Sequence, residues 1–411
     1  MTDLTQISQN RHDKNGHETK KKPSLSPTPL NVEQAVRDRY SDAAQKKVPA
    51  LCCPVDYDAS YLKVLPQELI ERDYGCGDPS KYVRPDETVL DLGSGGGKIC
   101  YVASQIVGRE GRVIGIDMND DMLALARRYQ APIGDRIGYH NVEFHKGRIQ
   151  DLALDLDRFE SHLAEQPVSS AADWARADAY ADELRRTAPM VADASIDVVI
   201  SNCVLNLVDA KDRQQLFAEL FRVLRRGGRA VISDIVSDEA VPAHLQNDPQ
   251  LWSGCISGAL VEHDFLKAFE AAGFYGARIV VRQQEPRAVV EGIEFRSMTV
   301  EAFKGKEGAC LDQHQAVIYN GPWKSVTDDD GHVLRRGVRT AVCGKTHAIY
   351  TRAPYDGQIT PVPPYQSVAE NEAAEYDCHA GKVRHPRETK GQGYQHTELP
   401  ESDCCCSDGC C

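Results

Sequence analysis

VLDLGSGGGKICYVA, residues 89–103, joins a short apolar run to the apolar pattern of a helix through a cluster of glycines. Glycines at a turn between a strand and a helix let the backbone approach a ligand closely, and they leave helix N–H groups facing that ligand. The stretch therefore predicts a strand, a ligand-binding turn and then a helix over residues 98–107.

The residues that follow repeat this order of strand and helix. Strand patterns occupy 112–117, 141–147, 196–202, 228–235, 277–283 and 295–303, and helix patterns occupy 120–129, 213–224 and 263–273. Such alternation predicts a parallel sheet covered by helices on both faces. We therefore expect an α/β, Rossmann-like fold with a mostly parallel sheet of about seven strands.

Changes in composition divide the 411 residues into segments. The polar leader at 1–30 has no periodicity, and we expect it to be disordered. The main domain spans 31–303, with two helical patterns at 152–194 that predict a helical insertion, because a structureless loop of this length is uncommon. Short β-like runs around a DDDG turn predict a small β-rich appendage at 304–355. The polar, proline-containing residues 356–411 predict a flexible tail.

The chain is acidic, with 48 basic and 61 acidic residues and a net charge of −13. An acidic chain repels phosphate backbones, so we expect no nucleic-acid partner. No run approaches the ~20 apolar residues of a membrane helix, and the first residues lack the apolar core of a signal peptide. We expect a cytoplasmic monomer that binds no membrane and keeps its cysteines as thiols.

Acidic residues accompany the glycine turn. Asp91 precedes Gly93 and Gly95, and Asp117 ends the next strand pattern, 24 residues beyond Gly93. A carboxylate about 20 residues after such glycines is typical of a site that binds ribose hydroxyls. Lys98 stands where a dinucleotide site needs glycine or alanine, so a nucleoside ligand other than NAD is expected.

These features resemble the class I S-adenosylmethionine-dependent methyltransferases, and RVLRRGGRAVISD at 222–234 adds to the likeness. The resemblance implies S-adenosylmethionine as cofactor, with the glycine turn around its methionyl part, Asp117 on its ribose and residues 147–150 beside its adenine. The implied cofactor-binding residues are Asp91, Gly93, Ser94, Gly95, Asp117, Met118, Ile149, Gln150 and Asn202.

Four cysteine contexts bear on the methyl acceptor. They are LCCPVDYD at Cys52 and Cys53, DYGCGDP at Cys76, SNCVLNL at Cys203 and LWSGCISGAL at Cys255. Cys203 follows a strand at the carboxyl edge of the sheet, where α/β sites form. A thiol there is unusual for oxygen or nitrogen acceptors, which usually need a base nearby.

Together, YGCG, SNCV-x-NL and W-x-x-C-x-x-G-A resemble the arsenite S-adenosylmethyltransferases over roughly residues 32–355, and the closest form is the bacterial and algal one associated with arsenosugar biosynthesis. The resemblance implies arsenite and methylarsenite as substrates, and glutathione or thioredoxin as reductants. By this resemblance, trivalent arsenic is bound by Cys203, Cys255 and Cys76. Cys52 or Cys53 takes part in a thiol–disulfide relay, and Tyr74 helps to frame the pocket.

The chemistry agrees with this resemblance. Trivalent arsenic is soft and thiophilic, so thiolates are its natural ligands. Three sulfurs leave its lone pair free to attack a sulfonium methyl group, and no general base is needed. Two alternatives remain open at this point: a methyltransferase for a carbon, oxygen or sulfur acceptor, and a non-enzymatic, thiol-based metalloid-binding protein.

The remaining cysteines have no assigned chemistry. Cys100 fits the common role of free cysteine as a small buried hydrophobe, and Cys310 and Cys343 are left without a predicted role. The five cysteines of CCCSDGCC at 404–411 either collect arsenite or form an incidental solvent-exposed tail.

Overall fold

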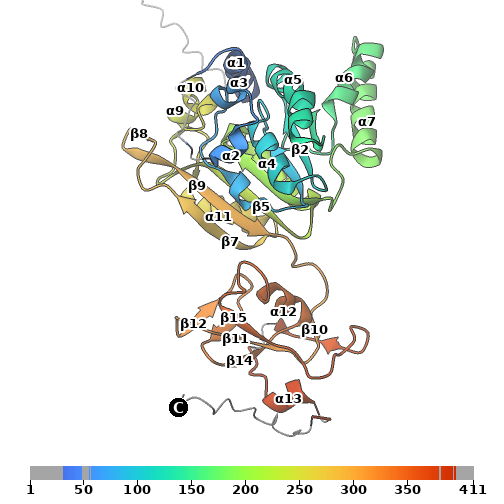
Figure 1. The fold of residues 1–411 in the computed structure, drawn as a ribbon, viewed down its shortest axis with the longest axis vertical. Coiled ribbons are helices and arrows are strands. Elements are labelled where there is room, and N and C mark those ends of the chain that lie inside the picture. The colour runs from blue at the N-terminus through green and yellow to red at the C-terminus, as the bar shows by residue number, and fades with distance from the viewer. Residues whose placement is uncertain (1–30, 49–54, 56, 379–380, 392, 395–411) are drawn as a thin grey trace, which may run out of the picture.

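The structure, a computed structural model, describes residues 31–48, 55, 57–378, 381–391 and 393–394 (Figure 1). The leader at 1–30, Cys52 and Cys53, and the cysteine cluster at 404–411 lie outside these described residues.

The expected strands form one sheet. Its strands are β1 (Thr88–Leu92), β2 (Arg112–Asp117), β3 (Val142–Lys146), β4 (Ile196–Asn202), β5 (Leu224–Ser237), β6 (Leu260–Val261), β7 (Tyr275–Arg282), β8 (Ala288–Val290) and β9 (Ile293–Phe303). The main order is β3-β2-β1-β4-β5-β9-β7; the first five strands run parallel, and β9 runs antiparallel to both of its neighbours, β5 and β7. Short β6 and β8 pair with β5 and β9. The prediction of a mostly parallel sheet of about seven strands is confirmed, and the short strands β6 and β8 are additions that the sequence did not indicate.

Helices cover both faces of this sheet because successive strand residues point to opposite sides. In β4, Val199 packs into the cluster that contains α8 (Arg213–Val223) and α11 (Glu262–Ala271). Its neighbours Val198 and Ile200 pack into the cluster on the other face, with α4 (Lys98–Val107) and α5 (Asp120–Ile137).

Further elements precede β1 or connect the later strands. They are α1 (Val32–Gln45), α2 (Ala59–Leu62), α3 (Gln67–Glu71), η2 (Pro79–Tyr82), η3 (Leu205–Leu207), η4 (Ala210–Asp212), α9 (Ala243–Gln246) and α10 (Pro249–Ser253). Helix α1 packs against both α5 and α10 (Figure 1).

The predicted helical insertion consists of α6 (Leu156–Glu165) and α7 (Ala171–Thr187), which share a small apolar cluster. Helix α5 runs to Ile137, past the predicted end at residue 129. It continues through Pro132 because the next turn still contributes to the core, where Ile133 is buried.

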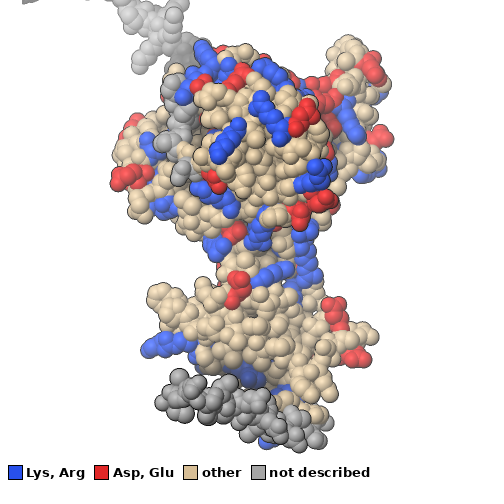
Figure 2. All heavy atoms as spheres, in the orientation of Figure 1, with Lys and Arg blue, Asp and Glu red and all other residues tan. Residues whose placement is uncertain are grey.

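Charges of both signs mix on the face of the main domain in Figure 2. Among the described residues, none of the helices combines the length and the apolar character needed to span a membrane.

The C-terminal unit, set apart from the main sheet in Figure 1, is built from short strands and two helices. They are β10 (Leu311–Asp312), β11 (Ala316–Tyr319), β12 (Ser325–Thr327), β13 (Val333–Arg335), β14 (Arg339–Ala341), α12 (Gly344–Tyr350), β15 (Ile359–Val362), β16 (Ala374–Glu375) and α13 (Pro386–Lys390). The expected DDDG turn lies between the paired strands β12 and β13.

Two expectations for this unit are wrong. Residues 344–350 look β-like but form helix α12, because the Cys343 side chain accepts a hydrogen bond from the Thr346 N–H at the helix start and the Ile349 and Tyr350 side chains are buried. The chain after residue 355 also remains structured as far as α13, because β15 pairs with β11 and β16 pairs with β10.

Truncation after Tyr355 tests this second correction. It removes the β15 partner of β11 and uncovers the apolar cluster to which Ile359 contributes, so residues 304–355 should become readily cleaved by protease. Limited proteolysis with mass mapping of the cleavage sites measures this. Truncation after Tyr394 is the control and should protect the same residues; equal protection of both truncated chains would contradict the assignment.

Candidate active site

A cavity opens at the carboxyl ends of β1, β2 and β4. The turn after β1 forms one wall, where the N–H groups of Gly93 and Ser94 both donate to the Ile116 carbonyl at 2.8 and 2.9 Å. Gly93 has a φ of +67°, and an added Cβ would lie 2.4 Å from Val204 Cγ1. Only glycine fits this position, which explains one of the glycines that the sequence places here.

The cavity brings together most of the predicted site residues. The predicted residues in its wall are Tyr74, Asp91, Gly93, Ser94, Gly95, Asp117, Met118, Ile149, Gln150, Asn202 and Cys203. Two further predicted residues, Cys76 and Cys255, lie directly behind Cys203.

Two carboxylates lie on the glycine side of the cavity. Asp117 accepts hydrogen bonds of 2.8 Å from the N–H groups of Gly95 and Asn119, so its position is fixed by the turn and by the start of α5. Asp91 is buried and accepts a hydrogen bond from the Cys100 thiol at 3.2 Å. Burial raises the pKa of Asp91 to about 7 despite that hydrogen bond, so a cation nearby would favour its charged form.

Cys203 lies at the end of β4, where the backbone takes an unusual conformation. Its φ is +64°, and its N–H donates to the Ser233 carbonyl at 2.7 Å. Cys255 also has a positive φ, +61°, and its thiol donates to the Cys203 carbonyl at 3.0 Å. Non-glycine residues in this region each cost about 1–3 kcal/mol and cluster at functional sites.

The three thiols form one buried group. Cys76, Cys203 and Cys255 are 1%, 3% and 4% exposed, and the Cys203 thiol interacts with the other two. Burial raises the pKa of the Cys76 thiol, and it raises that of Cys203 further, with added contributions from both neighbouring cysteines. The Cys76 and Cys203 thiols therefore keep their protons until an electrophile replaces them.

Cys76 precedes the sheet in sequence, but its loop is hydrogen-bonded to the end of β4. The N–H groups of Cys76 and Gly77 donate to Asn202 Oδ1 at 2.8 and 3.0 Å, and Asn202 Nδ2 donates back to the Gly77 carbonyl at 2.7 Å. Asn202 lines the cavity, but its amide group holds the Cys76 loop in place.

Comparison with known proteins agrees with this geometry. A family model described as a methyltransferase domain matches residues 84–187 and 179–273, and one described as a domain of unknown function matches 306–394. An arsenite methyltransferase of Aquipseudomonas alcaligenes is 31% identical over 337 residues, which cover 77% of this chain and 86% of the relative.

The chain belongs to the arsenite methyltransferase family.

Two further members support this assignment. The arsenite methyltransferase of Mus musculus is 31% identical over 74% of this chain and 75% of its own length. The solved structure of an arsenic(III) S-adenosylmethionine methyltransferase from Chlamydomonas reinhardtii superposes with a TM-score of 0.51 and 26% identity, covering 79% of this chain and all of that one. The class I methyltransferase fold predicted from the glycine turn is therefore confirmed.

Sequence reasoning missed several residues that position the thiols in this family member. Lys98 is buried, pairs with Asp73 at 2.8 Å and lies 3.5 Å above the centre of the Tyr57 ring. The Tyr57 hydroxyl in turn donates to the Gly77 carbonyl at 3.2 Å. Lys98, which makes the turn unsuitable for NAD, thus helps to hold the loop that carries Cys76. In the sequence, only its unusual position in the glycine motif distinguished it.

The second asparagine of SNCVLNL secures the other side of the thiol group. Asn206 Nδ2 donates to Asp234 Oδ1 at 2.8 Å, to the Ile235 carbonyl at 2.6 Å and, at 3.4 Å, to the Cys255 carbonyl. Asp234 is buried and lies within 4.8 Å of the Cys203 and Cys255 sulfurs. Burial raises its pKa to about 6.

Aromatic residues close the cavity above the thiols. Tyr40 of α1 is hydrogen-bonded to Cys255, and burial together with the nearby Cys255 and Cys203 raises its pKa. Tyr74 packs edge-to-face against it, with ring centres 6.3 Å apart. The Tyr74 hydroxyl donates to the Ala43 carbonyl at 3.0 Å, so this predicted residue also fixes the end of α1.

Replacement of Asn202 by alanine should release Cys76. The buried N–H groups of Cys76 and Gly77 lose their acceptor, which costs about 1–3 kcal/mol for each unsatisfied group. Cys76 should then be alkylated much faster than in the unaltered protein, as measured by mass spectrometry of its peptide. Asn206→Ala is the matched control, because it should accelerate labelling of Cys255 instead. Unchanged labelling of Cys76 in Asn202→Ala would show that other contacts hold the loop.

Proposed function

We propose that this protein transfers a methyl group from S-adenosylmethionine to trivalent arsenic held by Cys76, Cys203 and Cys255. The observation that carries the proposal is the convergence of three buried thiols from three separate segments, of which Cys203 lines the cavity and the other two lie behind it. Two of these thiols sit on strained backbone, a cost that packing alone does not explain.

The glycine side of the cavity fits the cofactor. Gly95 has open space where a Cβ would be, so a ligand can approach its backbone, and Ser94 Oγ is buried without a partner in the described structure. Asp117 offers carboxylate oxygens to ribose hydroxyls, and Asp91 offers a negative charge to a cationic ligand. When bound, S-adenosylmethionine supplies a methyl group activated by its positively charged sulfur.

The thiol side fits the substrate. Arsenite is a trihydroxide in neutral water, and each thiol can replace one hydroxide and release one water, which gives a neutral arsenic trithiolate. No charge is then left inside this buried site, where an unpaired charge would be costly. The arsenic keeps its lone pair as the nucleophile, and the protein contributes the positioning, an effect worth roughly 7–11 kcal/mol in well-oriented reactions.

Methyl transfer raises arsenic to the pentavalent state, so the cycle needs two electrons. Two protein thiols supply them when they form a disulfide, and a reductant such as glutathione or thioredoxin reopens it by thiol exchange. We assign the relay to Cys76 with Cys52 or Cys53, the last two of which lie outside the described residues. The need for reduced thiols suits a cytoplasmic enzyme, either in arsenic detoxification or in arsenosugar synthesis.

Cys203→Ser and Cys255→Ser should each abolish arsenite methylation and leave affinity for S-adenosylmethionine nearly unchanged, because these thiols lie away from the glycine turn. Chromatography of arsenic species after incubation with arsenite, S-adenosylmethionine and a thiol reductant measures the first effect, and calorimetry measures the second. The control is Cys100→Ser, where a hydroxyl can still donate to Asp91. Activity of either variant within a few-fold of the unaltered enzyme would contradict the proposed site.

The pH dependence of cofactor binding tests the role of Asp91. With a pKa of about 7, the ionised fraction of Asp91 rises about tenfold between pH 6 and pH 8. Affinity for the cationic cofactor should rise by about the same factor, since a neutral carboxyl offers no charge to it. Asp91→Asn should bind more weakly and lack this increase. Calorimetry at the two pH values measures both proteins, and an equal pH response of both would exclude Asp91 as its source.

A further inference from the structure

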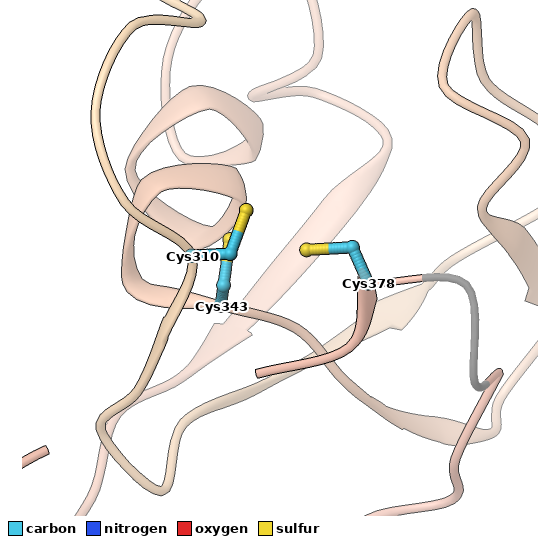
Figure 3. A group of neighbouring side chains, drawn as sticks. All are labelled: Cys310, Cys343 and Cys378. Atoms are coloured by element: carbon cyan, nitrogen blue, oxygen red, sulfur yellow. The ribbon is translucent and has the colours of Figure 1, made fainter. Parts of the chain in front are cut away.

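A second group of thiols lies in the C-terminal unit, away from the cavity. The sulfurs of Cys310, Cys343 and Cys378 all lie within 4.8 Å of one another. Cys310 directly precedes β10, Cys343 precedes α12 and Cys378 follows β16, so three segments distant in sequence supply one thiol each. Figure 3 shows the three side chains directed toward a common point.

Backbone contacts hold these segments together. The Tyr376 N–H donates to the Cys310 carbonyl at 2.9 Å, and β10 pairs with β16 just beside it. The Tyr376 hydroxyl donates to the Ala341 carbonyl at 2.9 Å, two residues before Cys343. Tyr376, two positions before Cys378, thus connects the Cys378 segment to the segments of Cys310 and Cys343. The position of the three thiols is therefore set by the fold.

The three thiols differ in exposure and in acidity. Cys343 is fully buried, whereas Cys310 and Cys378 are half-buried, so the group can be reached from solvent on one side. Burial alone would raise the pKa of Cys343, but hydrogen bonds from Thr346 and from the two other thiols lower it below its usual value. Burial instead raises the pKa of Cys378, and the hydrogen bonds and charges of the two neighbouring thiols raise it further.

We propose that Cys310, Cys343 and Cys378 form a second binding site for trivalent arsenic. The choice of ligand rests on the proposed function, which makes arsenic the substrate of this protein. The number of donors also favours it, because the described structure places no fourth His, Cys, Asp or Glu with these sulfurs. Three sulfurs complete the pyramidal coordination of trivalent arsenic, whereas structural zinc takes four ligands.

Charge points to the same ligand. Each thiol replaces one hydroxide of arsenite and releases one water, so three sulfur–arsenic bonds form, no electrons are transferred and the product is neutral. Zinc bound by three thiolates would keep a net charge of −1 beside the fully buried Cys343, and burying an unpaired charge is costly.

Arsenic content of the full-length protein tests this site. The five terminal cysteines are first replaced by serine, so that they bind none of it. In this background the triple variant Cys310→Ser, Cys343→Ser, Cys378→Ser should bind about one arsenic fewer per chain after equilibration with arsenite and removal of the excess. Mass spectrometry counts the arsenic. In a Cys203→Ser, Cys255→Ser protein that keeps the second site, X-ray absorption should show that the bound arsenic has only sulfur neighbours. Cys100→Ser is the matched control and should keep the full content.

Cys378→Ser alone guards against misfolding, because it leaves the buried Cys343 intact. It should weaken arsenite binding at this site at least tenfold, as measured by titration in the Cys203→Ser, Cys255→Ser background. Unchanged arsenic content in the triple variant would overturn the proposal, as would one zinc per purified chain that arsenite fails to displace and that the triple variant lacks. Failure of the proposed function looks different: Cys203→Ser, Cys255→Ser would then retain both full arsenic content and methylation.

Discussion

The amide of Asn202 is the contact on which the thiol group of the cavity depends. It stands at the last position of β4, next to Cys203, and both of its polar atoms bind the loop of Cys76 and Gly77. A loop that precedes the sheet by sequence is thereby fixed to the carboxyl edge of a central strand. This contact requires glycine at position 75, because a Cβ there would lie 2.0 Å from Asn202 Nδ2.

Backbone strain and buried polar groups at this carboxyl edge of the sheet are unfavourable to folding. Cys203 and Cys255 both have a positive φ, and burial raises the pKa values of Cys76, Cys203 and Asp234. The fold offsets these unfavourable terms with the surrounding apolar cluster and with the hydrogen bonds of Asn202 and Asn206. The three thiols are thereby held in place before any arsenic arrives, so little reorganisation accompanies binding.

The sequence predicts this architecture well where one local pattern governs it. Alternating strand and helix patterns gave the main sheet, and the glycine turn with Asp117 marked the wall of the cavity. Prediction failed where contacts distant in sequence decide: residues 344–350 are helical because of burial and the Cys343 cap, and the chain after 355 is ordered by pairing with β11. Cys310 and Cys343 had no predicted role, because the pairing of β10 with β16, which brings Cys378 to them, is not visible in the sequence.

Helix α1 links the two halves of the cavity physically. On the glycine side, Asn119 Nδ2 at the start of α5 donates to the Arg37 carbonyl at 3.2 Å and to Ser41 Oγ at 3.1 Å. On the thiol side, Arg39 donates to the Ser253 hydroxyl at 2.9 Å, and Tyr40 is hydrogen-bonded to Cys255. Asn119 lies two residues after Asp117, and Ser253 lies two residues before Cys255. A displacement of α1 would therefore change hydrogen bonds on both ligand-binding sides of the cavity, so α1 couples the position of the glycine side to that of the thiol side.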